Sequence, residues 1–150
     1  MSEATGALRE QLDEIVRGAG FRIVELHTSV VKGRTHANLV IYRPEGVGIN
    51  DIAEVHKTVL PRLELLLDDR DVALQVASPG IDRTIKDNSE FAVFHGRGVK
   101  ILERKTDEWL GGVVGAADDE AVEIETEEGV RRIPYAEIQK AKLDHTQEVR

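Results

Sequence analysis

The residue types that most often perform catalysis or bind metals form no known constellation in this sequence. The chain contains five histidines: His27, His36, His56, His95 and His145. No two of them have the spacing of an HxH or HExxH metal motif, and there is no cysteine. A GxSxG nucleophile motif and a Walker-type phosphate loop are also missing. We therefore expect a protein that is not an enzyme and that binds no metal and no cofactor.

Acidic residues cluster strongly in one short segment of the chain. Seven of the 11 residues from 118 to 128 are aspartate or glutamate. Val122 and Ile124 alternate with acidic residues, so a strand over residues 121–127 would bury the apolar side chains and turn the acidic ones outward. The outward residues, called the acidic stripe below, are Glu123, Glu125 and Glu127. They would attract lysine and arginine side chains.

The acidic stripe has two interpretations that the residues alone leave open. It is either a solvated outer face, whose repulsion Arg131 and Arg132 on the next strand would offset, or a docking surface for a Lys/Arg-rich protein segment. The basic residues are candidates for contacts with RNA or with a protein partner. These candidates are Arg97, Arg131 and Arg132.

The overall charge limits the classes of partner. The net charge is −8, of which residues 1–87 contribute −3 and residues 88–150 contribute −5. Because affinity for phosphates rests on clustered lysine and arginine, neither half is expected to be a general polyanion binder. No predicted strand carries two aromatic residues at alternate positions, as base-stacking RNA modules do. An acidic surface suits a basic protein partner, or serves only solubility, and any RNA contact is expected to be local and weak.

The sequence also bears on the compartment. The N-terminal residues lack the basic and apolar regions of a signal peptide, and no apolar run approaches the length that spans a bilayer. The absence of cysteine fits a reducing environment. We expect a cytoplasmic monomer without membrane contact.

The first half of the chain mixes helices and strands. Apolar residues at helical spacing predict one helix over residues 5–17 and another that begins at Asn50 or Asp51. Pro61 is expected to kink the second helix or to start a new segment. Alternating apolar residues predict three strands, over residues 21–31, 36–42 and 72–77. Two amphipathic helices on one face of a three-stranded sheet would bury all these apolar residues.

The second half reads as short strands. A short helix over residues 88–94 comes first, and a 3₁₀ turn is expected over residues 135–138. Five strands are predicted, over residues 98–103, 109–117, 121–127, 130–134 and 139–143. Glycine-rich bends at Gly111, Gly112 and Gly115 favour a small, strongly bent β-barrel of the SH3 or Sm type. The predicted fold class is therefore α+β.

The stretch that joins the two halves runs from Asp71 to Arg83. Its strand is expected to end at a tight turn, because Pro79 removes a backbone donor and Gly80 can adopt a positive φ. Asp82 and Arg83 follow, and we interpret them as structural residues that pair or cap near the junction. The predicted domains are residues 1–83 and 84–150.

The residues around this turn also carry a resemblance. The run VASPGIDR at residues 76–83 closely resembles the signature of the RimP family of bacterial ribosome maturation factors. The similarity extends over about residues 7–143. Supporting segments are FRIVEL at 21–26, LVIY at 39–42, DIA at 51–53, FAVFHGRGVK at 91–100, IP at 133–134 and IQKA at 138–141. The sequence departs from the family at Ala77, usually serine, at Thr84, usually proline, and at Pro61, which interrupts a normally smooth helix.

The resemblance implies a function. Family members have an N-terminal α/β domain and a C-terminal SH3/Sm-like barrel, and they assist assembly of the small ribosomal subunit without catalysing a reaction. They associate with free small subunits and help to incorporate the basic ribosomal protein twelve. The resemblance marks its signature residues as an interdomain turn: Ser78, Pro79, Gly80, Asp82 and Arg83. The alternative function is a general Sm-like RNA-binding module.

Overall fold

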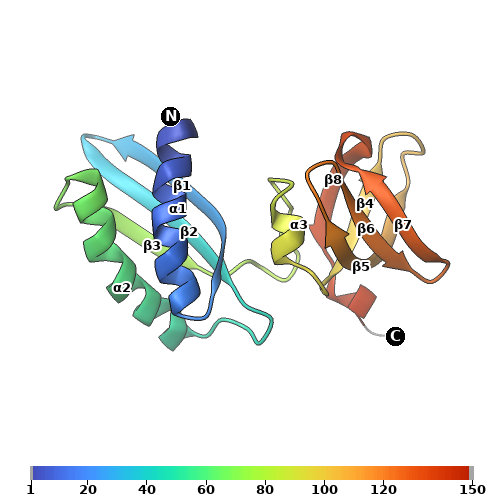
Figure 1. The fold of residues 1–150 in the computed structure, drawn as a ribbon, viewed down its shortest axis with the longest axis horizontal. Coiled ribbons are helices and arrows are strands. Elements are labelled where there is room, and N and C mark those ends of the chain that lie inside the picture. The colour runs from blue at the N-terminus through green and yellow to red at the C-terminus, as the bar shows by residue number, and fades with distance from the viewer. Residues whose placement is uncertain (1, 149–150) are drawn as a thin grey trace. The chain divides into compact units, whose positions relative to one another are not determined.

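The computed structural model describes residues 2–148 and divides the chain into two compact units (Figure 1). Unit 1 comprises residues 1–79 and unit 2 comprises residues 80–150. The division falls at Pro79 and Gly80, inside the signature turn and a few residues before the boundary expected from the sequence. The two units contain helices and two separate sheets, so the predicted α+β class is confirmed.

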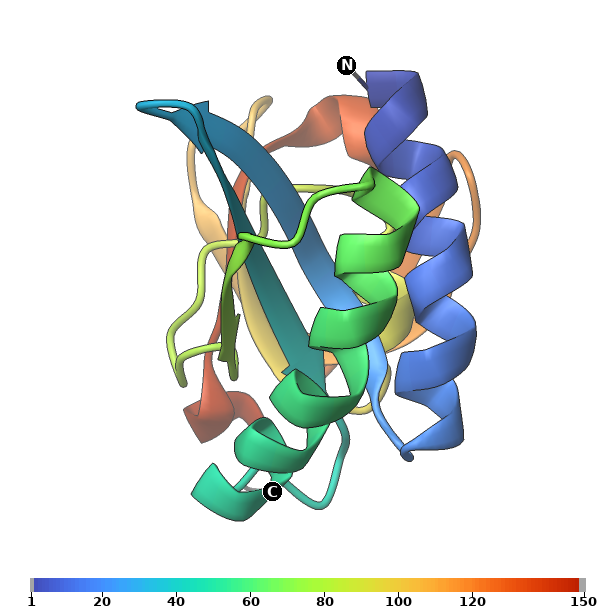
Figure 2. The same ribbon diagram turned by 90° about the vertical axis from the view of Figure 1, so that its left-hand side faces the viewer.

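Unit 1 has the predicted order of helix, strand, strand, helix and strand. Its elements are α1 (Ser2–Gly18), β1 (Arg22–Val31), β2 (Arg34–Tyr42), α2 (Ile49–Leu67) and β3 (Ala73–Ala77). The sheet order is β1-β2-β3, with β1 antiparallel and β3 parallel to the central strand β2. Figure 2 shows α1 and α2 side by side on one face of this sheet. The crossover through α2 is what allows β2 and β3 to run parallel.

The core of unit 1 lies between the helices and the sheet. Apolar side chains at every fourth position of each helix are buried against buried side chains of β1 and β2. The helical residues are Leu8, Leu12 and Val16 from α1, and Val55, Val59 and Leu63 from α2. Each such side chain contributes roughly 1.5–3 kcal/mol when fully buried. The helices are therefore held mainly by this packing rather than by intrinsic propensity.

The predicted start of α2 is wrong, and so is one of the two alternatives expected at Pro61. The helix begins after Gly48, not at Asn50 or Asp51, because the Gly48 N–H donates to Oδ2 of Asp51 at 2.8 Å and Asp51 thus caps from inside the first turn. The helix also continues through Pro61 as one element, so no second segment starts there. Pro61 lies on the exposed side, and the buried residues on either side of it hold the helix together.

Unit 2 contains one short helix and five strands. These elements are α3 (Glu90–Val93), β4 (Gly98–Glu103), β5 (Trp109–Ala117), β6 (Ala121–Thr126), β7 (Gly129–Pro134) and β8 (Ile138–Leu143). The 3₁₀ segments are η1 (Tyr135–Glu137) and η2 (His145–Glu148). Phe91 and Phe94 are fully buried, as expected for the inner face of α3. The strand bounds agree with the predictions to within one residue.

The five strands form one antiparallel sheet with the order β7-β6-β5-β4-β8. No ladder joins β7 to β8 among the described residues, so the closed barrel expected from the sequence is not found. Hydrogen bonds outside the strand ladders link β7 to the end of β4, and the turn after β4 to η1. Arg131 of β7 donates to Glu103 at the end of β4, and the N–H of Arg104 donates to the carbonyl of Glu137. The outer edge of β8 pairs with the segment around Thr84.

Close backbone approach in unit 2 leads to a testable prediction at Gly112. A Cβ at this position would lie 2.5 Å from the carbonyl oxygen of Glu125 and 2.6 Å from Cγ2 of Ile124. Gly112→Ala is therefore expected to lower the free energy of unfolding by about 1–3 kcal/mol. Gly6→Ala in α1 is the control, because nothing lies within 4 Å of a Cβ there, and it should be neutral or stabilising. Thermal unfolding followed by circular dichroism distinguishes the two; equal melting temperatures would contradict the close approach.

None of the helices in the described part of the chain combines the length and the hydropathy that crossing a bilayer requires.

Candidate functional site

The acidic stripe lies on β6 and on the turn that follows it. Val122 and Ile124 are fully buried, and Glu123 and Glu125 lie between and beyond them on the other face of the strand. β6 ends at Thr126, one residue before the predicted end, because Oγ1 of Thr126 donates to the carbonyl of Gly129 and closes the turn. Glu127 therefore belongs to the turn and does not continue the alternation of the strand.

The two arginines of β7 lie on opposite faces of the sheet. Arg132 is directly across from Glu123, whereas Arg131 is across from the buried residue Ile124. Adjacent residues in a strand point to opposite faces, so the expectation that both arginines offset the stripe is wrong. Arg131 instead pairs with Glu103 at 2.8 Å. Only Arg132 lies on the acidic face.

Arg132 joins the acidic face to the turn before β6. Its Nη2 lies 2.9 Å from Oδ2 of Asp118. Asp118 also accepts hydrogen bonds from the N–H groups of Glu120 and Ala121, and these bonds, followed by that from Arg132, lower the pKa of Asp118. The Asp118 carboxylate thus orders the β5–β6 turn and is charged at neutral pH. Both groups are exposed, so the pair contributes little to stability.

Arg97 lies just before β4, and its carbonyl accepts a hydrogen bond from the N–H of Val114 in β5. Its Nε donates to Oε2 of Glu148 at 2.9 Å, and the N–H of Gly98 donates to the same oxygen. Burial is the largest single influence on Glu148 and opposes its ionisation. The two hydrogen bonds, together with the positive charges of Arg97 and His145, outweigh burial and lower the pKa of the carboxyl group. Arg97 therefore fixes the C-terminal 3₁₀ segment to β4. All three candidate arginines are engaged with carboxylates of unit 2.

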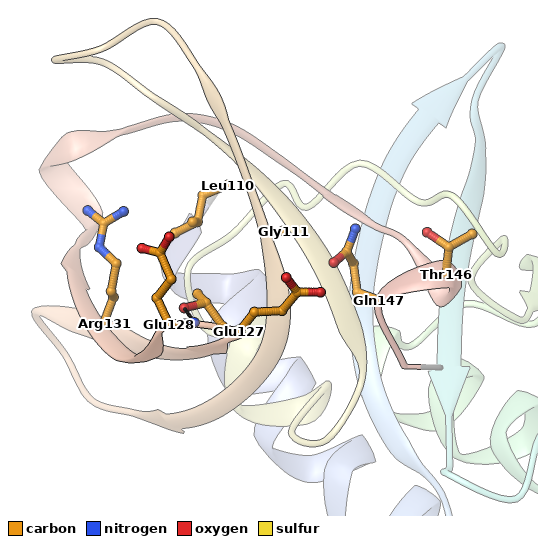
Figure 3. Close-up of a pocket in the computed structure, with 8 residues that line it drawn as sticks. Leu110, Gly111, Glu127, Glu128, Arg131, Thr146 and Gln147 are labelled. Atoms are coloured by element: carbon orange, nitrogen blue, oxygen red, sulfur yellow. Dashed lines mark hydrogen bonds between the residues drawn. The ribbon is translucent and has the colours of Figure 1, made fainter. Parts of the chain in front are cut away.

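A shallow depression of about 410 Å³ adjoins the end of the acidic stripe. It is lined by Leu110, Gly111, Thr126, Glu127, Glu128, Arg131, Thr146 and Gln147. Figure 3 shows the Glu127 side chain extending toward Gln147, whereas Glu128 and Arg131 lie on the side of Glu127 away from Gln147. Gln147 lies over Gly111, because a Cβ on Gly111 would come within 2.6 Å of the Gln147 amide. The depression extends the acidic surface past the end of β6.

The signature turn is built differently from the prediction. Gly80 is not among the residues with positive φ, and a Cβ on it would meet only Oδ1 of Asp82, at an ordinary 3.6 Å. The turn residues Ser78, Gly80 and Asp82 are exposed and Pro79 is partly buried. The expected positive φ at Gly80 is therefore wrong, since the chain turns through a hydrogen bond from the N–H of Arg83 to the carbonyl of Gly80.

Arg83 is held inside unit 2 by Glu90. Nε and Nη2 of Arg83 donate to the two carboxylate oxygens of Glu90 at 2.9 and 3.1 Å, a two-pronged geometry. The Glu90 side chain is 1% exposed and that of Arg83 is 9% exposed. The N–H groups of Lys86 and Asp87 donate to Oε2 of Glu90 as well. Glu90 thus binds the chain that follows the signature turn.

Glu90 was missed in the sequence because its burial is tertiary information. A glutamate at the start of a short helix is usually solvated. The only available signal was its position seven residues after Arg83, which does not reveal a contact.

Within the described residues, no three His, Asp or Glu side chains lie together in a way that could hold a metal ion.

The chain is similar to known proteins over most of its length. A family model described as the RimP N-terminal domain matches residues 11–82. The ribosome maturation factor RimP of Borrelia turicatae (strain 91E135) is 28% identical over 142 residues, which cover 95% of this chain and 94% of the relative. The protein of the same name from Borrelia hermsii (strain HS1 / DAH) is 27% identical over 124 residues, covering 83% of this chain and 85% of the relative. The similarity therefore spans both units.

Proposed function

Because the chain belongs to the RimP family of ribosome maturation factors, we propose that it assists maturation of the small ribosomal subunit. In this proposal the protein binds free small subunits and their precursors, and it helps to incorporate the basic ribosomal protein twelve. It acts as a cytoplasmic monomer, without catalysing a reaction and without a cofactor.

The acidic face of unit 2 is the observation that carries the proposal. Glu123 and Glu125 lie on the outer side of β6, and Glu127 and Glu128 of the following turn line the depression. Arg132 is the β7 arginine across from Glu123, and its ion pair is with Asp118. Arg131 lines the depression, and its ion pair is with Glu103. Negative charge therefore dominates this surface, and it suits a Lys/Arg-rich segment that must be kept from premature contact with RNA.

We infer the domain types of the two units from those of the RimP family. Five short antiparallel strands with a 3₁₀ turn before the last support our proposal that unit 2 is a variant of the SH3/Sm-like fold. We keep residues 1–83 and 84–150 as the functional domains, with the signature turn between them. Its buried Arg83–Glu90 pair supports a structural role for the signature, which presents the binding surface rather than forming it.

Sedimentation of a cell extract through a sucrose gradient tests the proposed function. The protein is expected to travel with free small subunits and to be absent from translating ribosomes. Deletion of its gene is expected to leave small-subunit precursors. Recovery of the protein only in the top fractions of the gradient, together with normal subunit profiles after deletion of the gene, would contradict the proposal.

A general Sm-like RNA-binding module is the alternative. It would bind naked RNA tightly and lose that affinity steeply as salt rises. The ion pairs of Arg97, Arg131 and Arg132 disfavour it, because each arginine would have to exchange a carboxylate for a phosphate.

A further inference from the structure

The outer face of β5, β4 and β8 differs in charge from the rest of unit 2. Val99 and Ile101 of β4 are fully buried, so Lys100 and Leu102 point to the opposite, outer face of the sheet. Five side chains share this face, which we call the lysine–tryptophan face: Lys100, Leu102, Trp109, Lys140 and Lys142.

Strand register places these residues in two adjacent rows. In one row Lys100 lies directly between Gly111 of β5 and Lys142 of β8. In the next row Leu102 lies between Trp109 and Lys140. Directly opposed side chains in an antiparallel pair have Cβ atoms about 4.5–5.5 Å apart. The three lysines and the tryptophan therefore form one continuous surface.

The lysines of this face are available to a partner. Among the described residues, none of the three has a carboxylate within 4.0 Å, in contrast to Arg97, Arg131 and Arg132. Lys100 contributes to the lowered pKa of Asp144, although hydrogen bonds from Thr146 and Gln147 contribute more. Lys100 and Lys142 oppose each other directly, and two like charges in that position repel. An anion between them would relieve this repulsion.

Trp109 supplies a flat apolar surface beside the lysines. It is 47% exposed, and Nζ of Lys100 lies 5.2 Å from the centroid of its ring. An exposed tryptophan next to basic residues is the combination by which proteins bind single-stranded nucleic acid, with the ring stacking on a base and the cations on phosphates. An acidic protein segment would use the lysines but gains little from an exposed indole ring.

We propose that the lysine–tryptophan face binds a short single-stranded segment of RNA, with one base stacked on Trp109 and phosphates on Lys100, Lys140 and Lys142. The lysine–tryptophan face lies on β5, β4 and β8 and borders η2, whose Gln147 covers Gly111. Glu125 of the acidic stripe, across from Val113, lies on the same outer face of the sheet but on β6. The proposal rests on the proposed function only for the source of the RNA. Three phosphate contacts give weak binding, consistent with the net negative charge of the chain.

Fluorescence of Trp109 tests the contact directly, because it is the only tryptophan in the chain. Titration of the full chain with a 12-nucleotide oligouridine should quench its emission. The logarithm of the binding constant should fall with the logarithm of salt with a slope of about −2, the value for three phosphate contacts on a single strand. No quenching up to millimolar RNA at low salt would overturn the proposal.

Charge reversal on β8 locates the contact. Lys140→Glu with Lys142→Glu should weaken RNA binding by more than about ten-fold and reduce the slope to about −0.7. The matched control is Lys57→Glu with Arg62→Glu, two exposed residues of α2 in unit 1 that change the net charge equally and should leave the affinity within about two-fold. Equal losses in both variants would mean only a general charge effect and would overturn the proposal.

A second variant removes the ring instead of the charge. Trp109→Leu, measured by anisotropy of labelled oligouridine, should weaken binding by about five-fold or more. A polyglutamate peptide that quenches Trp109 at the same concentration as the RNA would show that the face recognises acidic chains in general, and the RNA assignment would fail. These assays use naked RNA, so their failure leaves co-sedimentation with small subunits intact, and a failure of co-sedimentation leaves them intact.

Discussion

Glu90→Gln is expected to destabilise unit 2 by about 3–5 kcal/mol, the usual cost of removing one partner from a buried ion pair. The amide retains the shape and one acceptor oxygen, but it removes the negative charge that Glu90 places beside the guanidinium of Arg83. It also weakens the acceptor for the N–H groups of Lys86 and Asp87. Arg83, Lys86 and Asp87, which all donate to the Glu90 carboxylate, would each be held less firmly.

Urea unfolding of the full chain measures this effect. Trp109 lies in unit 2, so its emission follows the unfolding of that unit separately. The expected fall in the free energy of unfolding corresponds to a fall in melting temperature of more than about 10 °C. Glu137→Gln is the matched control, because its partner Lys105 is highly exposed and that pair should contribute little to stability. A loss below 1 kcal/mol for Glu90→Gln would contradict the anchoring role.

A double-mutant cycle separates the pair from its surroundings. Arg83→Met alone leaves the carboxylate of Glu90 buried, and Glu90→Leu alone removes the charge that pairs with Arg83. Each single variant should cost at least as much as Glu90→Gln. Arg83→Met combined with Glu90→Leu removes both charges, so the double variant should recover part of the stability. Additive losses in the double variant would mean that the two side chains act independently.

Reversing the acidic stripe should weaken binding to the basic ribosomal protein by roughly 100-fold at low salt. The variant carries Glu123→Lys, Glu125→Lys and Glu127→Lys. Since the strand keeps Val122 and Ile124 in the core, unit 2 should stay folded. Much of the loss should appear in the association rate, because long-range attraction becomes repulsion.

A charge-matched control keeps this experiment specific. Glu10→Lys, Glu14→Lys and Glu54→Lys change exposed residues of the two unit 1 helices and alter the net charge by the same amount. Surface plasmon resonance at two salt concentrations compares the variants. If the control loses as much affinity as the stripe variant, or if the stripe variant binds like the native protein, then the stripe is only a solvated face.

The sequence alone determined the local elements of both units. Alternation in β4, β5 and β6 and the apolar spacing of α1 and α2 gave bounds close to those observed, because period and turn chemistry are local properties of the chain. The signature at residues 76–83 likewise indicated the resemblance to the RimP family before any tertiary contact was known. The acidic stripe was visible for the same reason, since two residues of one strand two apart share a face.

Tertiary structure alone decided which charges meet. Arg131 and Arg132 are neighbours in sequence, yet β-sheet register sends one to Glu103 and the other to Asp118. Burial turned Glu90 from an ordinary surface residue into the anchor of Arg83, and pairing of β4 with β5 and β8 assembled the lysine–tryptophan face from residues up to about 40 positions apart. Such pairings depend on long-range register and on exclusion of water, and neither is encoded in the spacing of residues along one strand.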